Sequence, residues 1–383
     1  MLLLRNGKLL TMGEKDYLDG GDLLIDGGKI IAVGTDLSAP GAQVIDAKGC
    51  YVLPGIIDAH CHIGMWEDGM GQEGSDGNEA TAPVTAEMRA IDGINPFDPC
   101  WQEALEAGVT TAVTGPGSAN VIGGQFVAMK TTPGSVEARI VKEPLALKTA
   151  FGENPKRVYG SQKKSPGTRM ATAAIFRQAM LDGLSYAKKM NAADEDKRPE
   201  RSLAKEMLAL AATGQILVKA HAHRADDILT ALRLRDEFGL NMTLEHCTEG
   251  YLIPEALKAA NLPIILGPLL SERSKIELKN LTFKAPAILH KAGVRFALMT
   301  DHPVIPLQYL FLSAALAVRE GLPEREALKA ITLNGAWATG LSDRLGSLEV
   351  GKDADFALYD GHPLDARIAP RQVYVNGVLA CEK

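Results

Sequence analysis

The stretch YVLPGIIDAHCHIGMW, at positions 51–66, runs from an apolar segment into two histidines. The apolar half predicts a buried strand, and the histidines follow where that strand should end. Side chains alternate along a strand, so His60 and His62 point the same way and Cys61 points the opposite way. Taken alone, the segment fits a metal site, a reactive cysteine or a structural pair of imidazoles.

Similar apolar runs recur through the middle of the chain, with helical patterns between several of them. The strand candidates are 55–63, 109–115, 144–152, 215–223, 241–247, 262–267 and 294–301, with an eighth somewhere in 124–141. The helical patterns cover 168–213, 225–239, 254–261 and 285–293. Strands that alternate with helices favour a parallel sheet, and eight such units close into a (β/α)8 barrel. We therefore predict an α/β fold built on a TIM-like barrel.

Both ends of the chain are rich in short β-like runs and tight turns. The turn signals are Asn6-Gly7, Asp26-Gly27-Gly28 and Asn376-Gly377. Each is flanked by apolar runs, a pattern that predicts a hairpin. The two end segments would then pair as a small sandwich outside the barrel.

The composition narrows the class of protein. The chain has 383 residues, of which 46% are hydrophobic, and a net charge of −6 without a long basic run, so nucleic acid is not an expected partner. No apolar stretch approaches the roughly 20 residues that span a bilayer, and the first residues lack a signal-peptide pattern. The five cysteines have no paired spacing, which predicts a reduced, cytoplasmic protein. We expect a small-molecule substrate, no membrane partner and barrel helices that could support a homo-oligomer.

Five of the eight histidines lie at the ends of predicted strands. They are His60, His62, His221, His223 and His246, and Asp301 ends a further strand. In a barrel the C-terminal strand ends meet on one face. Imidazole and carboxylate are ligands of zinc and similar divalent metals, so this set predicts a metal site. Cys61 and Cys247 are expected to be small buried hydrophobes instead.

The motifs VLPGIIDAHCHI, VKAHAH, TLEHCTEG and ALMTDHP, in this order, resemble the amidohydrolase superfamily. The likeness is to the branch of imidazolonepropionase-like enzymes and metal-dependent dipeptidases. The segments NGKLLTM, GKIIAVG and GSLEVGKDADFALYD match its terminal strands, so the resemblance covers almost the whole chain. It implies a composite β-sandwich domain from residues 1–53 and 345–383, and a distorted (β/α)8 hydrolase barrel from residues 54–344.

The resemblance also implies a ligand set for one or two divalent ions per chain, with zinc as the expected metal. The implied ligands are His60, His62, His221, His246 and Asp301. The fourth-strand ligand stays open between Glu153, which needs no modification, and Lys148, which would have to be carboxylated. If neither binds, the site holds one metal.

The implied reaction is hydrolysis of an amide, cyclic amide or dipeptide C–N bond by a metal-activated hydroxide. Asp301 would accept the proton of the water and pass it to the leaving amine. His223 should face the same cavity and either polarise the carbonyl or act through hydrogen bonds, and His302 should point away.

Two other functions stay open. A deaminase of an aminated heterocycle uses the same scaffold, but the glutamate that it needs after His221 is absent from AHRADD. A non-catalytic barrel is the other possibility, and the full ligand set disfavours it.

Substrate recognition is the least defined part of the sequence. Arg157, Tyr159 and Arg169 follow the fourth strand and could bind a substrate carboxylate, or could be structural. The acidic, glycine-rich segment 64–83 is either a lid or a surface loop. The chain lacks the flanked glycine patterns of nucleotide-binding loops, so no nucleotide is expected.

Overall fold

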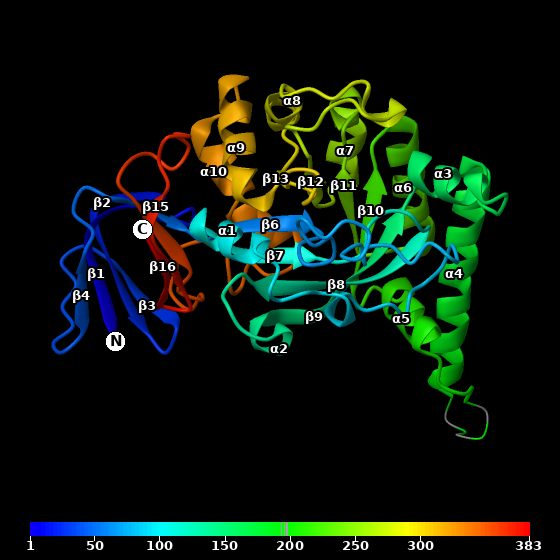
Figure 1. Cartoon of the computed structure of the whole chain (residues 1–383), viewed down its shortest axis with the longest axis horizontal. Coiled ribbons are helices and arrows are strands. Elements are labelled where there is room, and N and C mark those ends of the chain that lie inside the picture. The colour runs from blue at the N-terminus through cyan, green and yellow to red at the C-terminus, as the bar shows by residue number, and fades with distance from the viewer. Residues whose placement is uncertain (193, 195, 197) are drawn as a thin grey trace.

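The computed structural model describes every residue except 193, 195 and 197. In the described part of the chain the strands form two eight-stranded sheets, one from the middle of the chain and one from its two ends. Figure 1 shows the sheet of the chain ends at one side of the molecule and the larger helical and barrel region beside it.

The middle sheet is a nearly closed barrel. Its strands, in order, are β6 (Ile56–Cys61), β7 (Val109–Thr114), β8 (Ile122–Lys130), β9 (Ile140–Ala150), β10 (Leu217–Ala222), β11 (Met242–His246), β12 (Ile264–Leu266) and β13 (Phe296–Leu298). Near the ends of β6 and β13 the His62 amide donates to the His302 carbonyl at 2.9 Å, and the Asp301 amide donates to the His60 carbonyl at 3.3 Å. These bonds join the first and last strands beside the histidines. The TIM-like barrel predicted from the sequence is confirmed, and β8 is the strand expected within 124–141.

The barrel departs from the predicted run of parallel units at β8. This strand is antiparallel to both β7 and β9. The connections on its two sides are short: residues 115–121 contain no helix, and residues 131–139 contain only α2 (Val136–Arg139). A parallel crossover needs about a dozen residues or more, so these connections make hairpins instead.

Helices cover the outside of the barrel. They are α1 (Cys100–Glu106), α3 (Glu153–Ser161), α4 (Arg169–Met190), α5 (Leu203–Ala212), α6 (Ala225–Phe238), α7 (Pro254–Ala260), α8 (Ala285–Lys291), α9 (Leu310–Arg319), α10 (Glu324–Ala330) and α11 (Leu333–Ala338). The helical segment predicted at 168–213 is confirmed as α4 and α5, which lie at the end of the molecule far from the terminal sheet (Figure 1). None of the helices in the described residues has the length and apolar character needed to cross a membrane.

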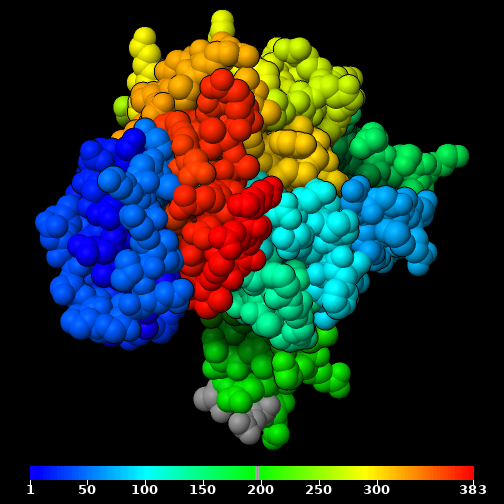
Figure 2. Space-filling model, turned by 60° about the vertical axis from the view of Figure 1, so that its left-hand side comes forward, coloured from blue at the N-terminus to red at the C-terminus, as the bar shows by residue number. Residues whose placement is uncertain are grey.

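The second sheet joins the two chain ends. Its strands are β1 (Leu2–Leu10), β2 (Tyr17–Asp26), β3 (Lys29–Gly34), β4 (Gln43–Asp46), β5 (Tyr51–Pro54), β14 (Phe356–Tyr359), β15 (Pro370–Val375) and β16 (Val378–Glu382). Strand β5 pairs antiparallel with β14 and so connects the N-terminal to the C-terminal strands. In Figure 2 the C-terminal segment lies between the N-terminal strands and the barrel. The buried Lys130 of β8 crosses this junction and pairs with Asp353 at 3.2 Å and with Asp355.

The predicted hairpins are confirmed at two of three places. The turns at Asp26-Gly27-Gly28 and Asn376-Gly377 connect β2 with β3 and β15 with β16. The hairpin predicted at Asn6-Gly7 is wrong, because β1 continues through both residues. Asn6 has a φ of +62°, and the register of β1 against β2 shifts here. The left-handed conformation that Asn-Gly favours is used for a β-bulge rather than for a reversal of the chain.

Candidate metal centre

The strand ends bring the predicted histidines together in two groups. His60, His62 and Asp301 form one group. His221, His223 and His246 form the other, and within each group the possible ligand atoms lie within 4.8 Å of one another. His60 and His62 come from the end of β6, and Asp301 follows β13. The alternation expected in the opening motif is confirmed for Cys61, which is buried with its Sγ 3.5 Å from the Val113 carbonyl oxygen.

Four of the imidazoles have Nδ1 within 3.0 Å of an oxygen of the protein, through a hydrogen bond for His62, His223 and His246 and as an ion-pair contact for His60. The pairs are His60 with the Glu245 carboxylate at 2.8 Å, His62 with the Gly115 carbonyl at 2.6 Å, His223 with the Thr248 hydroxyl at 2.7 Å, and His246 with the Gly267 carbonyl at 3.0 Å. An imidazole that donates from Nδ1 keeps its lone pair on Nε2, and metal-binding histidines are commonly fixed in this way. For His62 and His246 the partner is a carbonyl, which can only accept, so Nδ1 carries the proton.

The surroundings of these groups keep them in the protonation states that a metal requires. Burial lowers the pKa of His60 to about 4, with a further contribution from nearby Lys148. Burial also holds the pKa values of His223 and His246 well below their ordinary range. For Asp301 burial alone would raise the pKa, but the adjacent histidines outweigh it and hold the pKa well below its usual value. Neutral imidazoles beside an ionised carboxylate match the ligand chemistry of a divalent cation, so these residues fit a metal.

The structure separates the two candidates for the fourth-strand ligand. Lys148, on β9, is fully buried and its Nζ lies 3.0 Å from Nε2 of His60. Burial lowers the pKa of Lys148 to about 7, despite the opposing effect of nearby Glu245 and Asp301. Glu153 begins α3, and its carboxylate accepts a hydrogen bond from the Glu277 amide at 3.4 Å. Of these two residues, the structure brings Lys148 to a histidine.

A buried ion pair behind His60 was not predicted from the sequence. Glu245 and Lys219 are both fully buried, and Lys219 Nζ lies 3.1 Å from Glu245 Oε2. The same carboxylate oxygen faces Nδ1 of His60, and Lys219 also donates to the Ala59 carbonyl at 3.0 Å. Burial alone would raise the pKa of Glu245, but Lys219 and His60 lower it to about 2. Lys219 and His221 are two residues apart on one strand and so share a face, and this spacing could have indicated that the lysine lies near the site.

A second unpredicted carboxylate lies beside the other histidine group. Glu277 is buried in the loop after β12, and its Oε1 lies 3.7 Å from Nε2 of His221 and 3.6 Å from Nε2 of His223. Lys275 Nζ lies 3.1 Å from the same oxygen. No periodic pattern in the sequence marks this loop, so only the tertiary fold shows that Glu277 reaches the site.

The predicted substrate-binding residues lie in different surroundings. Arg157 is exposed on α3. Tyr159 is buried, and its hydroxyl is held by the Ala82 carbonyl and, at 2.6 Å, by Asn120 Oδ1. Arg169 forms a two-pronged ion pair with Asp227 at 2.7 and 2.9 Å. These partners give Tyr159 and Arg169 structural roles, so their predicted contact with substrate is not supported by the geometry.

The remaining predicted residues lie at the edge of the site. His302 is not a member of either group of possible metal ligands, and its Nδ1 accepts a hydrogen bond from the Leu307 amide at 3.2 Å. The acidic segment 64–83 does contact the site, because the ring of Trp66 packs edge-on against His62 with 5.1 Å between ring centres.

A nearly closed barrel with histidines and an aspartate at its strand ends is typical of metal-dependent hydrolases. A family model described as the amidohydrolase family matches residues 51–379, and the chain belongs to this family. Membership marks it as a hydrolase that acts on carbon–nitrogen bonds. The resemblance inferred from the sequence motifs is thereby confirmed.

Individual relatives agree with this assignment. The chain is 44% identical to the amidohydrolase from Thermotoga maritima MSB8, whose crystal structure it matches with a TM-score of 0.96 over 100% of both chains. It is 32% identical over 395 residues to amidohydrolase tasK of Hapsidospora irregularis, covering 93% of this chain but 39% of that protein. It is also 25% identical over 391 residues to imidazolonepropionase of Sphingopyxis alaskensis, covering 94% of this chain and 92% of the relative.

Proposed function

We propose that this chain hydrolyses an amide-type C–N bond, cyclic or peptide-like, with the help of a divalent metal. The observation that carries the proposal is the convergence of four buried imidazoles whose Nδ1 atoms each face a protein oxygen within 3.0 Å. Their Nε2 atoms are left for other partners beside an ionised aspartate. Burying so many polar groups together at one end of the barrel lowers the stability of the fold, and a structural role alone does not explain why the protein tolerates this.

The metal would be held by the residues that the family resemblance implies. These are His60, His62, His221, His246 and Asp301, with Lys148 as the bridging group if a second ion binds. When bound, a divalent cation lowers the pKa of coordinated water from about 15.7 toward about 7 and polarises the substrate carbonyl. The expected metal is zinc.

The protein groups then carry the proton transfers. Asp301 Oδ1 lies 3.2 Å from Nε2 of His62 and 3.5 Å from Nε2 of His60, so the carboxylate faces the reacting position. It accepts the proton of the attacking water and later delivers it to the leaving nitrogen. The Thr248 hydroxyl can donate to Nδ1 of His223, and in that arrangement the proton of the neutral ring lies on Nε2, 3.6 Å from Glu277 Oε1, from where it can be donated to the substrate carbonyl. One such donor typically contributes about 3 kcal/mol to the transition state.

Lys148 can become a bridging ligand only after modification. Its neutral amine would attack carbon dioxide, form a carbamate C–N bond and release one proton. The contact with His60 and the complete burial of the side chain support this role over the rival Glu153.

A second candidate reaction, ring deamination, is supported by one observation. The sequence lacks a glutamate after His221, but Glu277 Oε1 lies 3.7 Å from Nε2 of that histidine and could take its place. Release of ammonia from aminated heterocycles, without cleavage of amides, would favour deamination.

The test is metal analysis followed by assays against dipeptides, N-acyl amino acids, lactams and imidazolones. Asp301→Asn should lower kcat by a factor of about 100 or more while the protein stays folded. The exposed Asp19→Asn serves as the matched control and should keep full activity. Activity that persists after complete removal of the metal, or in Asp301→Asn, would overturn the proposal.

A further inference from the structure

A separate cavity of about 270 Å³ shares a wall with the candidate metal centre. It lies between the loop after β6, the start of α1 and the segment that follows β13. Its lining residues include Trp66, Glu67, Asp68, Glu103, His302 and Tyr309. Trp66 packs against His62 and His302 follows Asp301, so the wall between cavity and metal centre is one side chain thick.

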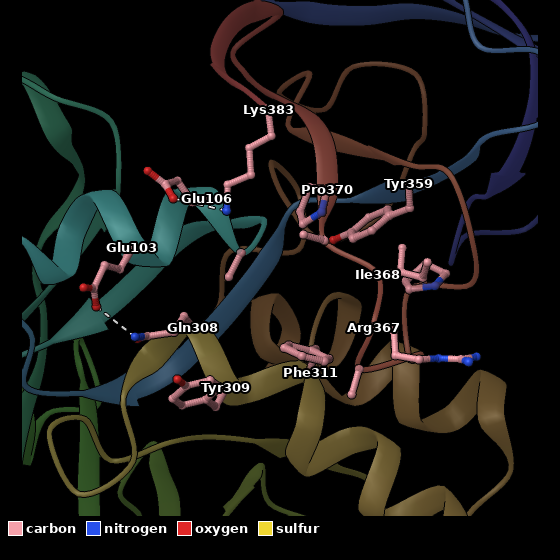
Figure 3. A pocket seen from close by; sticks show the side chains of 14 residues that line it. Glu103, Glu106, Gln308, Tyr309, Phe311, Tyr359, Arg367, Ile368, Pro370 and Lys383 are labelled. Carbon is pink, nitrogen blue, oxygen red and sulfur yellow. Dashed lines mark hydrogen bonds and ion pairs between the residues drawn. The ribbon is translucent and has the colours of Figure 1, made fainter.

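The cavity carries uncompensated negative charge. Three carboxylates line it, and among the described lining residues there is no lysine or arginine. Glu67 accepts a hydrogen bond from Asn95, and Glu103 accepts one from Gln308 at 2.8 Å, so the partners of both carboxylates are neutral amides. Figure 3 shows the Glu103–Gln308 bond and the adjacent ring of Tyr309, where this cavity borders a second pocket. Carboxylates and aromatic rings together favour a cationic ligand.

His302 supplies an independent sign that the cavity takes a ligand. The side chain is 2% exposed, and its Nδ1 accepts a hydrogen bond from the Leu307 amide. The proton must therefore sit on Nε2, and this buried atom has no hydrogen-bond partner. A buried donor without a partner is costly, and a ligand that offers an acceptor would satisfy it.

We propose that this cavity binds a ligand with a primary ammonium beside a neutral carbonyl, such as the amino end of a peptide or an amino amide. The ammonium lies among the carboxylates of Glu67, Asp68 and Glu103, and the carbonyl accepts from Nε2 of His302. A carboxylate in place of the carbonyl would be repelled by the acidic walls. Identification of this ligand with the amino end of the substrate rests on the proposed function, whereas the binding itself does not.

The first measurement is calorimetric titration of the metal-loaded protein at pH 7 with L-leucinamide and with N-acetyl-L-leucinamide. The acetylated probe keeps the carbonyl but loses the charge, and we expect it to bind at least about tenfold more weakly. The double variant Glu67→Gln/Asp68→Asn should weaken leucinamide binding by about tenfold and leave the acetylated probe unaffected. Glu67→Gln retains an oxygen for the hydrogen bond from Asn95, and equal metal content by elemental analysis shows that the metal centre is intact.

The matched control is Glu73→Gln, which removes the same charge from an exposed position of the same loop outside the cavity. It should bind leucinamide like the unaltered protein. Equal binding of both probes, or equal effects of the control and the double variant, would overturn the proposal.

Steady-state kinetics show whether the ligand of this cavity is the amino end of the substrate or a separate amine. If the cavity holds the amino end of the substrate, the double variant raises KM for an unblocked dipeptide and not for its N-acetyl form. If leucinamide binds but both KM values are unchanged, the cavity is a site for a separate amine, and its assignment to the substrate is overturned. If no substrate is hydrolysed at all, the proposed function fails while the titrations still decide whether the cavity binds an ammonium group.

Discussion

The pair of Glu245 and Lys219 behind His60 allows a quantitative test of how the barrel supports the site. In Glu245→Gln the carboxylate that faces both Lys219 and His60 is removed. Both members of the ion pair are fully buried, so the variant leaves an ammonium without a counter-charge, a change that typically costs about 3–5 kcal/mol. Burial already lowers the pKa of Lys219, so the lysine can lose its proton and the lower end of this range is expected.

The same substitution should also weaken metal binding. Loss of the carboxylate that orients a histidine ligand typically lowers metal affinity by about 10–100-fold, equivalent to about 1.4–2.7 kcal/mol. Urea unfolding of the metal-free protein measures the first effect, and competition with a chelator of known affinity measures the second. The double variant Lys219→Met/Glu245→Gln should recover much of the stability, because the unpaired charge is gone, but not the metal affinity.

A surface pair provides the control. Glu237 of α6 pairs with Arg177 at 2.8 Å, and both side chains are more than one-third exposed. Glu237→Gln should therefore change stability by about 1 kcal/mol or less and leave metal affinity unaltered. The reasoning is refuted if Glu245→Gln unfolds at the same urea concentration as the unaltered protein and holds its metal equally well.

Three further outcomes are expected. Lys148→Ala should reduce a two-metal centre to one metal by elemental analysis, whereas Glu153→Gln should keep both; the reverse result would restore Glu153 as the bridging ligand. Lys130→Met should lower the free energy of unfolding by about 3–5 kcal/mol in urea titrations, because the buried Asp355 carboxylate loses its paired cation, whereas Asp353 keeps Lys29 and Arg344. The metal-free protein should lose stability as the pH falls from about 6.5 toward 4, because burial holds the native pKa of His60 at about 4 and the unfolded chain takes up its proton first. Urea midpoints that do not change over this pH range would contradict the last expectation.

The positions of the predicted metal ligands follow from local rules. Strand alternation is a property of the backbone alone, so the H-x-H spacing was enough to place His60 and His62 on one face. Barrel geometry then accounts for the approach of His221, His246 and Asp301, since strand ends of one barrel share a face. Both rules need only the order and length of the strands, and the sequence pattern carries that information.

The choice between Lys148 and Glu153 depends on a turn that the pattern did not resolve. Gly152 has a φ of +85°, so the chain leaves β9 there and Glu153 begins α3. A Cβ at Gly152 would lie 2.9 Å from a carboxylate oxygen of Asp227 and 3.2 Å from one of Glu277. Two segments distant in sequence therefore leave too little room for a side chain at this turn, and Lys148 and Glu153, five residues apart, end in different surroundings.

Strand alternation fails at the residues where the site is most tightly built. Glu245 and His246 are consecutive, yet the first contacts His60 and the second joins His221 and His223. His246 has a φ of +70° and Asp301 a φ of +57°. Residues other than glycine rarely adopt this left-handed backbone conformation, which costs about 1–3 kcal/mol per residue. Surrounding hydrogen bonds hold these backbones, including the bond from the Asp301 amide to the His60 carbonyl. Backbone strain of this kind persists only where the surrounding structure holds the residue in place. The rule of strand alternation therefore fails at His246 and Asp301, which are also residues of the candidate metal centre.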